Sequence, residues 1–236
     1  MAVTAAADGA AISFESVTKA YSTKTESVKA LDAVSFKVEK GAIVAVVGPS
    51  GSGKTTLLNM AAALDFPTEG SVNVAGVVTS ALGKEDLQKF RNQTVGVVFQ
   101  QFFLIGHLNV FQNVMVPLIP RQLSSSEKTR RILESLAKVG LADKAERLPS
   151  ELSGGELQRA AIARGIVGDA PVILADEPTG NLDPKTAAQA LALMRAQIKA
   201  NAGAGILITH SRAAAGTADR ILVLDGRGLT SWAGPS

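Results

Sequence analysis

Two stretches near the start of the chain alternate apolar and polar residues. They cover residues 12–17 and 33–38, and the polar stretch 22–27 lies between them. Alternation with a period of two places the apolar side chains on one face of a strand. The pattern therefore predicts two half-buried strands that pair antiparallel at the beginning of the fold.

Short, continuous apolar runs of strand length follow. The first, residues 43–47, is mostly β-branched and is followed directly by a glycine, which is typical of a central strand covered on both faces. Helical patterns separate several of the later runs, as in an α/β protein. These runs lie at residues 95–99, 172–175, 205–209 and 221–224. The order predicts an α/β doubly wound fold with a mixed, mainly parallel sheet core.

The middle of the chain, residues 101–168, carries helix signals without an alternating strand. Ser124 and Glu127 have the spacing of a capping box, and Gly140 stands where that helix would end. Later, Asp183 precedes a proline, a favoured pair for the N-cap and first position of a helix. We therefore expect a helical insertion within the α/β core and a further helix after Asp183.

Composition and charge exclude several kinds of protein. With 46% apolar and 19% charged residues, the 236-residue chain can bury a sizeable core. The absence of cysteine excludes a disulfide framework and a thiolate metal site. No apolar run approaches the roughly 20 residues of a membrane-spanning helix, and the first ten residues lack the pattern of a signal peptide. The net charge of +3 is spread along the chain, so we expect no nucleic-acid partner.

A glycine-rich segment matches the pattern G-x-x-x-x-G-K-[ST] between a predicted strand and a helix that starts near Thr56. Its glycines let backbone N–H groups face phosphate oxygens, and the helix N-terminus adds positive potential. Lys54 would reach the outer phosphates and act in catalysis, while Thr55 would ligate Mg²⁺. The predicted nucleotide contacts are Gly48, Pro49, Ser50, Gly51, Ser52, Gly53, Lys54, Thr55 and Thr56.

Two adjacent carboxylates, Asp176 and Glu177, follow the apolar run 172–175. The carboxyl ends of the strands are the edge where open α/β sheets bind ligands. Neighbouring side chains of a strand point in opposite directions, so the pair can address different atoms of one site. We expect Asp176 to hold Mg²⁺ and Glu177 to act as a general base on the attacking water.

The glycine-rich segment from Gly48 to Thr55 has the pattern of a P-loop. Kinases, GTPases and motor ATPases all share this loop, so a second motif has to distinguish among these classes. Ser153, Gly154, Gly155 and Glu156 stand at the start of a predicted helix and form a second phosphate-binding N-terminus. One γ-phosphate cannot lie on two such cradles of a single subunit. The sequence therefore predicts a twofold dimer in which each copy offers this cradle to the ATP of the other.

Residues 152–159, LSGGELQR, resemble the signature motif of ABC ATPases, and the other motifs of that family follow in the expected order from about residue 12 to 224. The resemblance implies that Tyr21 stacks on adenine and that Gln100 contacts Mg²⁺ and the lytic water. It also implies that the segment ending at Asp183 crosses the dimer interface beside the nucleotide, and that His210 binds the γ-phosphate and takes part in catalysis.

Two positions depart from the commonest wording of the signature motif. Glu156 stands where glutamine is frequent, and Leu157 replaces a residue that is usually polar. An acidic residue at the first of these positions occurs within one group of the family. The chain also resembles this group in residues 175–183, in residues 104–118 and in the polar insertion after Tyr21. That group contains the lipoprotein-releasing, macrolide-, peptide- and haem-exporting, and cell-division ATPases.

The resemblance implies a single ABC ATPase domain with an antiparallel N-terminal β subdomain and a helical signature subdomain. We expect the core to cover about 12–100 and 169–228 and the helical subdomain about 101–168, with tails at 1–11 and 229–236. The implied cofactors are ATP and Mg²⁺, and the implied partners are a second copy of the chain and an integral-membrane permease. The resemblance further implies an exporter ATPase held by its permease at the cytoplasmic face of the cell membrane.

Two other functions remain open at this point. The first is a non-transport regulator, as in the cell-division relatives, in which closure of the dimer signals across the membrane. The second is an ABC ATPase of DNA repair or translation, which is disfavoured because the chain has no coiled-coil insertion, no zinc cysteines and no second nucleotide-binding domain. The transported substrate is not encoded here, because the selective surface belongs to the permease.

An apolar stretch closely follows Gln100 and could either fill the helical insertion or receive a short cytoplasmic helix of the permease. Its nearness to Gln100 favours the second use for part of the stretch, because movement at the γ-phosphate could then reach the partner through one short segment. The residues are Phe102, Phe103, Leu104, Val110, Val114, Met115 and Leu118.

Overall fold

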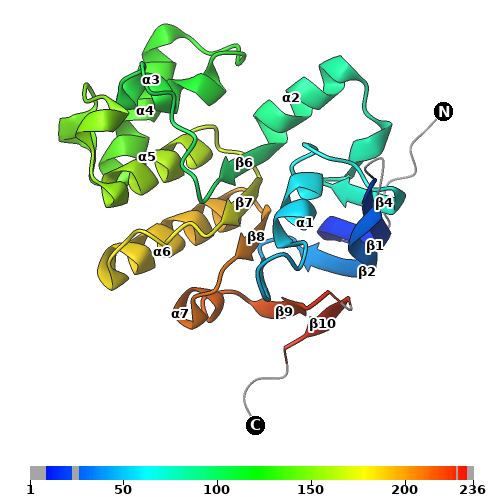
Figure 1. Cartoon of the computed structure of the whole chain (residues 1–236). Coiled ribbons are helices and arrows are strands. Elements are labelled where there is room, and N and C mark those ends of the chain that lie inside the picture. Colours follow the sequence, from blue (N-terminus) through cyan, green and yellow to red (C-terminus); the bar gives the residue numbers. More distant parts are fainter. Residues whose placement is uncertain (1–8, 23–26, 227, 233–236) are drawn as a thin grey trace.

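The computed structural model describes residues 9–22, 27–226 and 228–232. Residues 1–8 and 233–236 of the two expected tails, and residues 23–26 of the polar stretch, lie outside the described part. Two β-sheets lie side by side with helices around them (Figure 1). The smaller sheet is antiparallel, with the strand order β2-β1-β4-β5, and confirms the predicted antiparallel opening. Its strands are β1 (Ala10–Ser22), β2 (Ser27–Glu39), β4 (Glu69–Val74) and β5 (Val77–Val78).

The larger sheet has the strand order β10-β9-β3-β8-β7-β6. Strands β9, β3, β8, β7 and β6 are parallel, whereas β10 pairs antiparallel with β9. The continuous apolar runs of the sequence are the parallel strands, as predicted. Their bounds are β3 (Ile43–Val47), β6 (Val95–Val98), β7 (Val172–Asp176), β8 (Ala204–Ile208), β9 (Arg220–Leu224) and β10 (Leu229–Ser231).

The helices lie at different places around the two sheets. Helices α3, α4 and α5 gather beyond the β6 edge of the larger sheet, whereas α1 lies between the two sheets and α6 runs beside β7 and β8 (Figure 1). No described helix is long and apolar enough to cross a membrane. The α-helices are α1 (Lys54–Ala61), α2 (Lys84–Thr94), α3 (Val110–Met115), α4 (Ser125–Lys138), α5 (Gly154–Ile166), α6 (Pro184–Ala200) and α7 (Arg212–Ala215), and the 3-10 helices are η1 (Thr79–Ala81), η2 (Val116–Leu118), η3 (Ala142–Lys144) and η4 (Pro149–Glu151).

Apolar side chains cover both faces of the larger sheet. Val44 and Val46 of β3 belong to a core that also contains α1 and the antiparallel sheet. Ile43, on the other face of β3, belongs to a second core with α6 and the α3–α5 group. Because successive strand residues point to opposite faces, a strand buried on both sides has to be apolar throughout. This explains why the parallel strands appear in the sequence as unbroken apolar runs.

Several local expectations need correction. Helix α1 begins at Lys54, two residues before the predicted start. Ser124 caps α4, but only half of the predicted capping box forms, because the Glu127 carboxylate instead accepts hydrogen bonds from Arg130 and Arg131. Both ends of the described chain also form strands where tails were expected. Residues 10 and 11 begin β1, and residues 229–231 form β10, which pairs with β9.

Candidate functional site

The parallel strands carry the predicted site residues to one edge of the larger sheet. Their carboxyl ends lead into the P-loop after β3, the acid pair at the end of β7, and His210 shortly after β8. Gln100 follows β6 by two residues and is exposed beside the end of β7, since Val98 pairs with Ala175. Neighbouring parallel strands end side by side, so the topology gathers residues that lie up to 162 positions apart, from 48 to 210.

The P-loop requires glycine at two positions for steric reasons. Gly48 and Gly53 have φ angles of 153° and 95°, and a Cβ at either would clash with a backbone carbonyl oxygen, of Leu224 and Ala30 respectively. Ser52 is buried, and its Oγ has no hydrogen-bond partner within the described residues. A buried hydroxyl without a partner is costly, and a phosphate oxygen would satisfy it. The loop therefore fits an anionic ligand.

Lys54 lies folded over the loop that precedes it. Its Nζ donates to the carbonyl oxygens of Gly48, at 2.9 Å, and Pro49, at 2.7 Å, and its side chain is buried. Burial lowers the pKa of Lys54, while the negative charges of Asp176 and Glu177 oppose that shift. The ammonium thus lies at the centre of the loop and beside the acid pair.

Thr55 and Asp176 bring two hard oxygen donors together. The Thr55 hydroxyl donates to Oδ2 of Asp176 at 3.1 Å. Burial raises the pKa of Asp176, and the hydrogen bond from Thr55 partly offsets this. Mg²⁺ commonly binds one or two protein oxygens together with phosphate oxygens and waters. The pair fits such an ion, with Thr55 and Asp176 as its protein ligands.

Glu177 is anchored by the residues that follow β8. Its Oε1 accepts a hydrogen bond from the backbone N–H of His210 at 2.7 Å, and its Oε2 accepts one from the Thr209 hydroxyl at 3.2 Å. Its backbone has a φ of 45°, a conformation that is strained for a non-glycine residue. The His210 Nε2 lies 3.8 Å from Oε1 of the same carboxylate, and the imidazole is half exposed. The Glu177 carboxylate is therefore held in place, and the imidazole beside it is open to a ligand.

Tyr21 is held by two charged residues that the sequence did not single out. Its hydroxyl donates to Oδ2 of Asp65 at 2.7 Å, and Lys19 Nζ lies 4.9 Å from the centre of its ring. Lys19 also contacts Asp65 Oδ1 at 2.5 Å. Burial and the bond to Asp65 raise the pKa of Tyr21. Burial works to raise the pKa of Asp65 as well, but hydrogen bonds from Lys19 and Tyr21 hold it below its ordinary value.

The second cradle forms at the start of α5. Ser153 is the N-cap, and its side chain and that of Glu156 form a complete capping box, with Glu156 Oε2 accepting from Ser153 N at 2.8 Å. The first-turn N–H groups of Gly154 and Gly155 have no carbonyl partner within the helix. A Cβ at Gly154 would meet no atom within 4 Å, so this side of the helix N-terminus is open. The geometry fits a bound anion.

Residues 31–180 match the family described as ABC transporter. The chain belongs to this family. The lipoprotein-releasing system ATP-binding protein LolD of Chromohalobacter salexigens is 44% identical over 211 residues, which cover 89% of each chain. The macrolide export ATP-binding/permease protein MacB of Hyphomonas neptunium is 40% identical over 92% of this chain, but this chain spans only 34% of MacB.

Solved structures agree with the sequence comparisons. The ATP-binding cassette MJ0796, a dimer in a post-hydrolysis state bound to ADP and Pi, superposes with a TM-score of 0.88 at 36% identity. The superposition covers 95% of this chain and all of MJ0796. A second dimeric structure of MJ0796, a bacterial ABC transporter cassette, superposes equally well, at 37% identity. The chain is thus an ATP-binding and ATP-hydrolysing cassette of ABC type, and the predicted fold class is confirmed.

In this ABC ATPase the segment before α6 is fixed by local contacts. Asp183 is the N-cap of α6, and its Oδ1 accepts from the N–H groups of Lys185 and Thr186, each at 3.1 Å. Asn181 Nδ2 lies 3.5 Å from Oε1 of Gln158, a buried residue of α5. The predicted helix start is confirmed, whereas the interface role of Asp183 stays a prediction.

Residues that support the ABC site lie far from their partners in the sequence. Asp65 is 44 positions from Tyr21, and Thr209 is 32 positions from Glu177. Thr209 directly precedes His210, so its place at a strand end was a usable signal. No local pattern indicates Asp65, which lies between α1 and β4 and reaches Tyr21 of β1 only in the folded chain.

Proposed function

We propose that two copies of this ABC ATPase close on two ATP molecules and that hydrolysis powers a separate membrane permease. The observation that carries the proposal is the presence of two open anion cradles in one chain, at the P-loop and at the start of α5. A single γ-phosphate cannot occupy both cradles of one copy. Twofold pairing satisfies both, and MJ0796, which superposes over its whole length, is a dimer.

ATP binding would use residues on both sides of the P-loop. The ring of Tyr21 would stack on adenine, while Lys19 lies over the same ring and Asp65 fixes its hydroxyl. The P-loop amides and Lys54 would hold the phosphates. Mg²⁺ would be held by Thr55 and Asp176, with Gln100 completing the set and contacting the attacking water. This ion would neutralise charge that develops on the phosphate oxygens during transfer.

Hydrolysis would depend on Glu177 and His210. The carboxylate of Glu177, held by Thr209 and by the backbone of His210, would accept a proton from the attacking water. The His210 side chain is half exposed and would donate a hydrogen bond to the γ-phosphate. Gly154 and Gly155 of the second copy would contribute the amides that complete the site.

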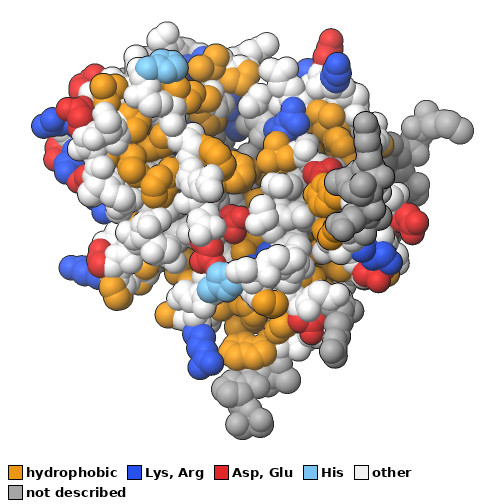
Figure 2. Space-filling view, in the orientation of Figure 1, with side chains coloured by type: hydrophobic (Ala, Val, Ile, Leu, Met, Phe, Trp, Pro, Cys, Tyr) orange, Lys and Arg blue, Asp and Glu red, His pale blue; other side chains and the backbone are white. Residues whose placement is uncertain are grey.

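A surface near Gln100 is suited to receive the permease. A cavity of about 300 Å³ is lined by Phe99, Phe103 and Arg164, among others. Phe103 is 59% exposed, and Arg164 donates to the carbonyl oxygens of Phe102 and Phe103, at 2.5 Å each. These bonds tie the segment after Gln100 to α5, the helix that carries the second cradle. Hydrophobic side chains are also exposed elsewhere over the α3–α5 group (Figure 2).

The rest of the predicted apolar stretch divides between core and surface. Val110, Val114 and Leu118 are fully buried and belong to the core, whereas Phe103 is exposed. Phe102, Leu104 and Met115 are partly buried. Ile119, the residue after Leu118, is also exposed, at 60%. We propose that Phe103 and Ile119 contact a short cytoplasmic helix of the permease. The permease would hold the subunit at the cytoplasmic face of the membrane.

We propose export as the direction of transport, with a lipoprotein, a peptide or antibiotic, or haem as the substrate class. The similarity to LolD over 89% of both chains and to the ATPase portion of MacB supports this choice. Signalling without transport is the alternative that the fold supports equally.

The test is co-purification of the subunit with the product of a neighbouring permease gene, followed by ATPase assays with candidate substrates. We expect ATP turnover that responds to one substrate class, and loss of turnover in Lys54→Ala because the phosphoryl charge is then uncompensated. Wild-type turnover in Lys54→Ala would refute the assigned P-loop. ATP turnover in the complex that no substrate changes would favour the signalling alternative.

A further inference from the structure

An acidic residue stands in the first turn of α5, where the proposed function requires an anion site. Glu156 is at position N3 of the helix, and its Oε2 accepts from the backbone N–H of Ser153 at 2.8 Å. A carboxylate at this place stabilises the helix itself. However, it also opposes a second anion at the same N-terminus, because the two negative charges repel each other. The site therefore needs a compensating positive charge.

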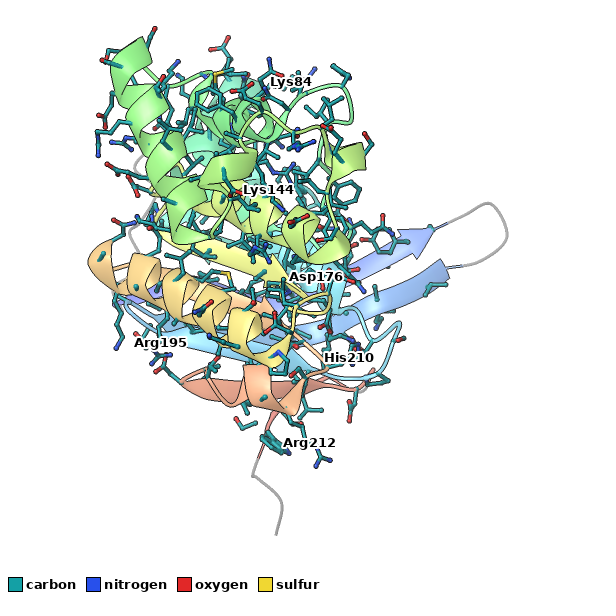
Figure 3. All side chains as sticks on the ribbon, turned by 90° about the vertical axis from the view of Figure 1, so that its left-hand side faces the viewer. Lys84, Lys144, Asp176, Arg195, His210 and Arg212 are labelled. Atoms are coloured by element: carbon teal, nitrogen blue, oxygen red, sulfur yellow. The ribbon has the colours of Figure 1, made fainter. Side chains whose placement is uncertain are left out.

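Lys144 supplies that charge from another element. It lies at the end of η3, 12 residues before Glu156, and its Nζ forms an ion pair with Oε1 of Glu156. Glu156 is thus held by two groups at once, with Oε2 on Ser153 N and Oε1 on Lys144. These two contacts lower the pKa of Glu156 to about 2, with Lys144 the main cause. Figure 3 shows Lys144 in the helical part, apart from Asp176 and His210 at the strand ends.

The contacts of Glu156 leave the remaining amides of the first turn free. Its carboxylate occupies the N–H of Ser153, and the Ser153 hydroxyl accepts from Glu156 N. Within the described residues, the first-turn N–H groups of Gly154 and Gly155 have no carbonyl partner in the helix. A Cβ at Gly154 would meet no atom within 4 Å, whereas one at Gly155 would lie 3.3 Å from the carbonyl oxygen of Asn181, so the helix N-terminus is open on the Gly154 side. If Glu156 lost Lys144, its carboxylate would carry an uncompensated charge beside these amides.

We propose that Lys144 is a positioning residue for ATP-driven dimerisation, which neutralises Glu156 and holds its carboxylate on the Ser153 amide so that Gly154 and Gly155 can receive the γ-phosphate bound by a second copy. This inference rests on the proposed function. It assigns to the Lys144–Glu156 ion pair of one copy a role at the nucleotide site of the other copy. Because a twofold dimer has two such sites, loss of the ion pair would affect the free energy of dimerisation at both of them.

The experiment measures ATP-induced dimerisation in a Glu177→Gln background, where slow hydrolysis preserves the bound nucleotide. Sedimentation velocity over a range of protein concentrations gives the dimer dissociation constant. We expect Lys144→Met to weaken the dimer about tenfold, as two repulsions of modest size would. Lys144→Arg should retain most of the affinity. Lys144→Met combined with Glu156→Gln should restore dimerisation, because the repelling charge is gone.

The dependence of dimerisation on ionic strength gives a second readout. A defect caused by lost packing would not be relieved by salt, whereas a defect caused by charge repulsion would be. Salt screens repulsion between partly exposed charges, so the defect of Lys144→Met should shrink as the salt concentration rises from 0.05 to about 0.5 M. Arg147→Met is the matched control, because Arg147 lies three residues away and pairs with Glu151 at 3.1 Å. It removes the same charge from the same part of the chain and should dimerise like the parent.

The outcomes separate this inference from the function on which it rests. If the Glu177→Gln parent forms no dimer with ATP, the proposed function fails and the inference fails with it. A parent that dimerises normally and a Lys144→Met variant that does the same would overturn the inference alone. A defect in Lys144→Met that neither Glu156→Gln nor salt relieves would show that the ion pair only supports folding. Should Lys144→Met fold poorly, Lys144→Gln replaces it in the same comparison.

Discussion

The Glu177 carboxylate accepts a hydrogen bond from the backbone N–H of His210 at 2.7 Å, so the ends of two neighbouring strands fix the proposed base. The same carboxylate lies 3.8 Å from the imidazole of His210. The contact to the main chain and the contact to the side chain can be separated by mutation, because only the second depends on the identity of residue 210.

Replacing Glu177 by glutamine should retain ATP binding and lower the hydrolysis rate by about 10² to 10⁴-fold, because the amide keeps the shape of the carboxylate but cannot accept a proton. The amide oxygen can still accept from His210 N. Turnover and nucleotide binding are measured on the same preparation. A rate within threefold of the wild type would remove Glu177 from the proposed role.

His210→Ala should lower turnover while nucleotide binding stays close to that of the wild type. The backbone N–H that holds Glu177 remains, so the loss reports only on the imidazole. We expect a fall of roughly 10²-fold, the lower end of what one positioned acid–base or hydrogen-bonding group contributes. Ser211→Ala is a useful control, because the Ser211 side chain caps α7 and does not contact Glu177. An unchanged rate in His210→Ala would return this histidine to a structural role.

The bond between Tyr21 and Asp65 should contribute to ATP affinity through the tyrosine ring. Tyr21→Phe removes the hydroxyl, and Asp65→Asn removes the charged acceptor, so each should raise the KM for ATP about threefold with little change in kcat. Tyr21→Ala should raise it further, because stacking on the base is lost. A double-mutant cycle then tests whether Asp65 acts through Tyr21. Independent, additive effects would contradict this arrangement.

The exposed and buried members of the apolar stretch should respond differently to charge. Phe103→Glu places a charge on a residue that is 59% exposed, so the isolated subunit should fold and bind ATP but assemble poorly with the permease. Val114→Glu places one in the core and should unfold the protein. Thermal unfolding and co-purification measure the two effects. Normal assembly of a folded Phe103→Glu variant would place the permease contact elsewhere.

The Lys144–Glu156 ion pair should give a defined pH dependence of stability. The pKa of Glu156 is lowered from 4.5 to about 2 in the folded protein, so the pair stabilises the fold fully above pH 4.5. That stabilisation is lost as the pH falls from 4.5 toward 2 and the carboxylate becomes protonated. Urea unfolding of the wild type and Lys144→Met should therefore differ at pH 6 and converge at low pH. In the Glu156→Gln background the difference should not depend on pH.

The fold class and most members of the candidate nucleotide site could be predicted from the amino-acid sequence. Apolar runs that need burial on both faces indicated the parallel strands, and the P-loop glycines were predicted because their backbone conformation excludes other residues. The start of α6 was also predictable, because Asp183 and Pro184 are a local capping signal. Such features depend on neighbouring residues in the chain, and the sequence reports them directly.

The side chains that hold the site residues in place could not be predicted from the sequence and became apparent only in the folded chain. The bonds of Asp65 to Tyr21, Thr209 to Glu177 and Lys144 to Glu156 join different elements, and no spacing rule links their partners. The division of the apolar stretch into a buried Val114 and an exposed Phe103 was equally hidden. Burial and long-range pairing depend on how the elements pack in space, and the order of residues along the chain does not contain that geometry in any local pattern.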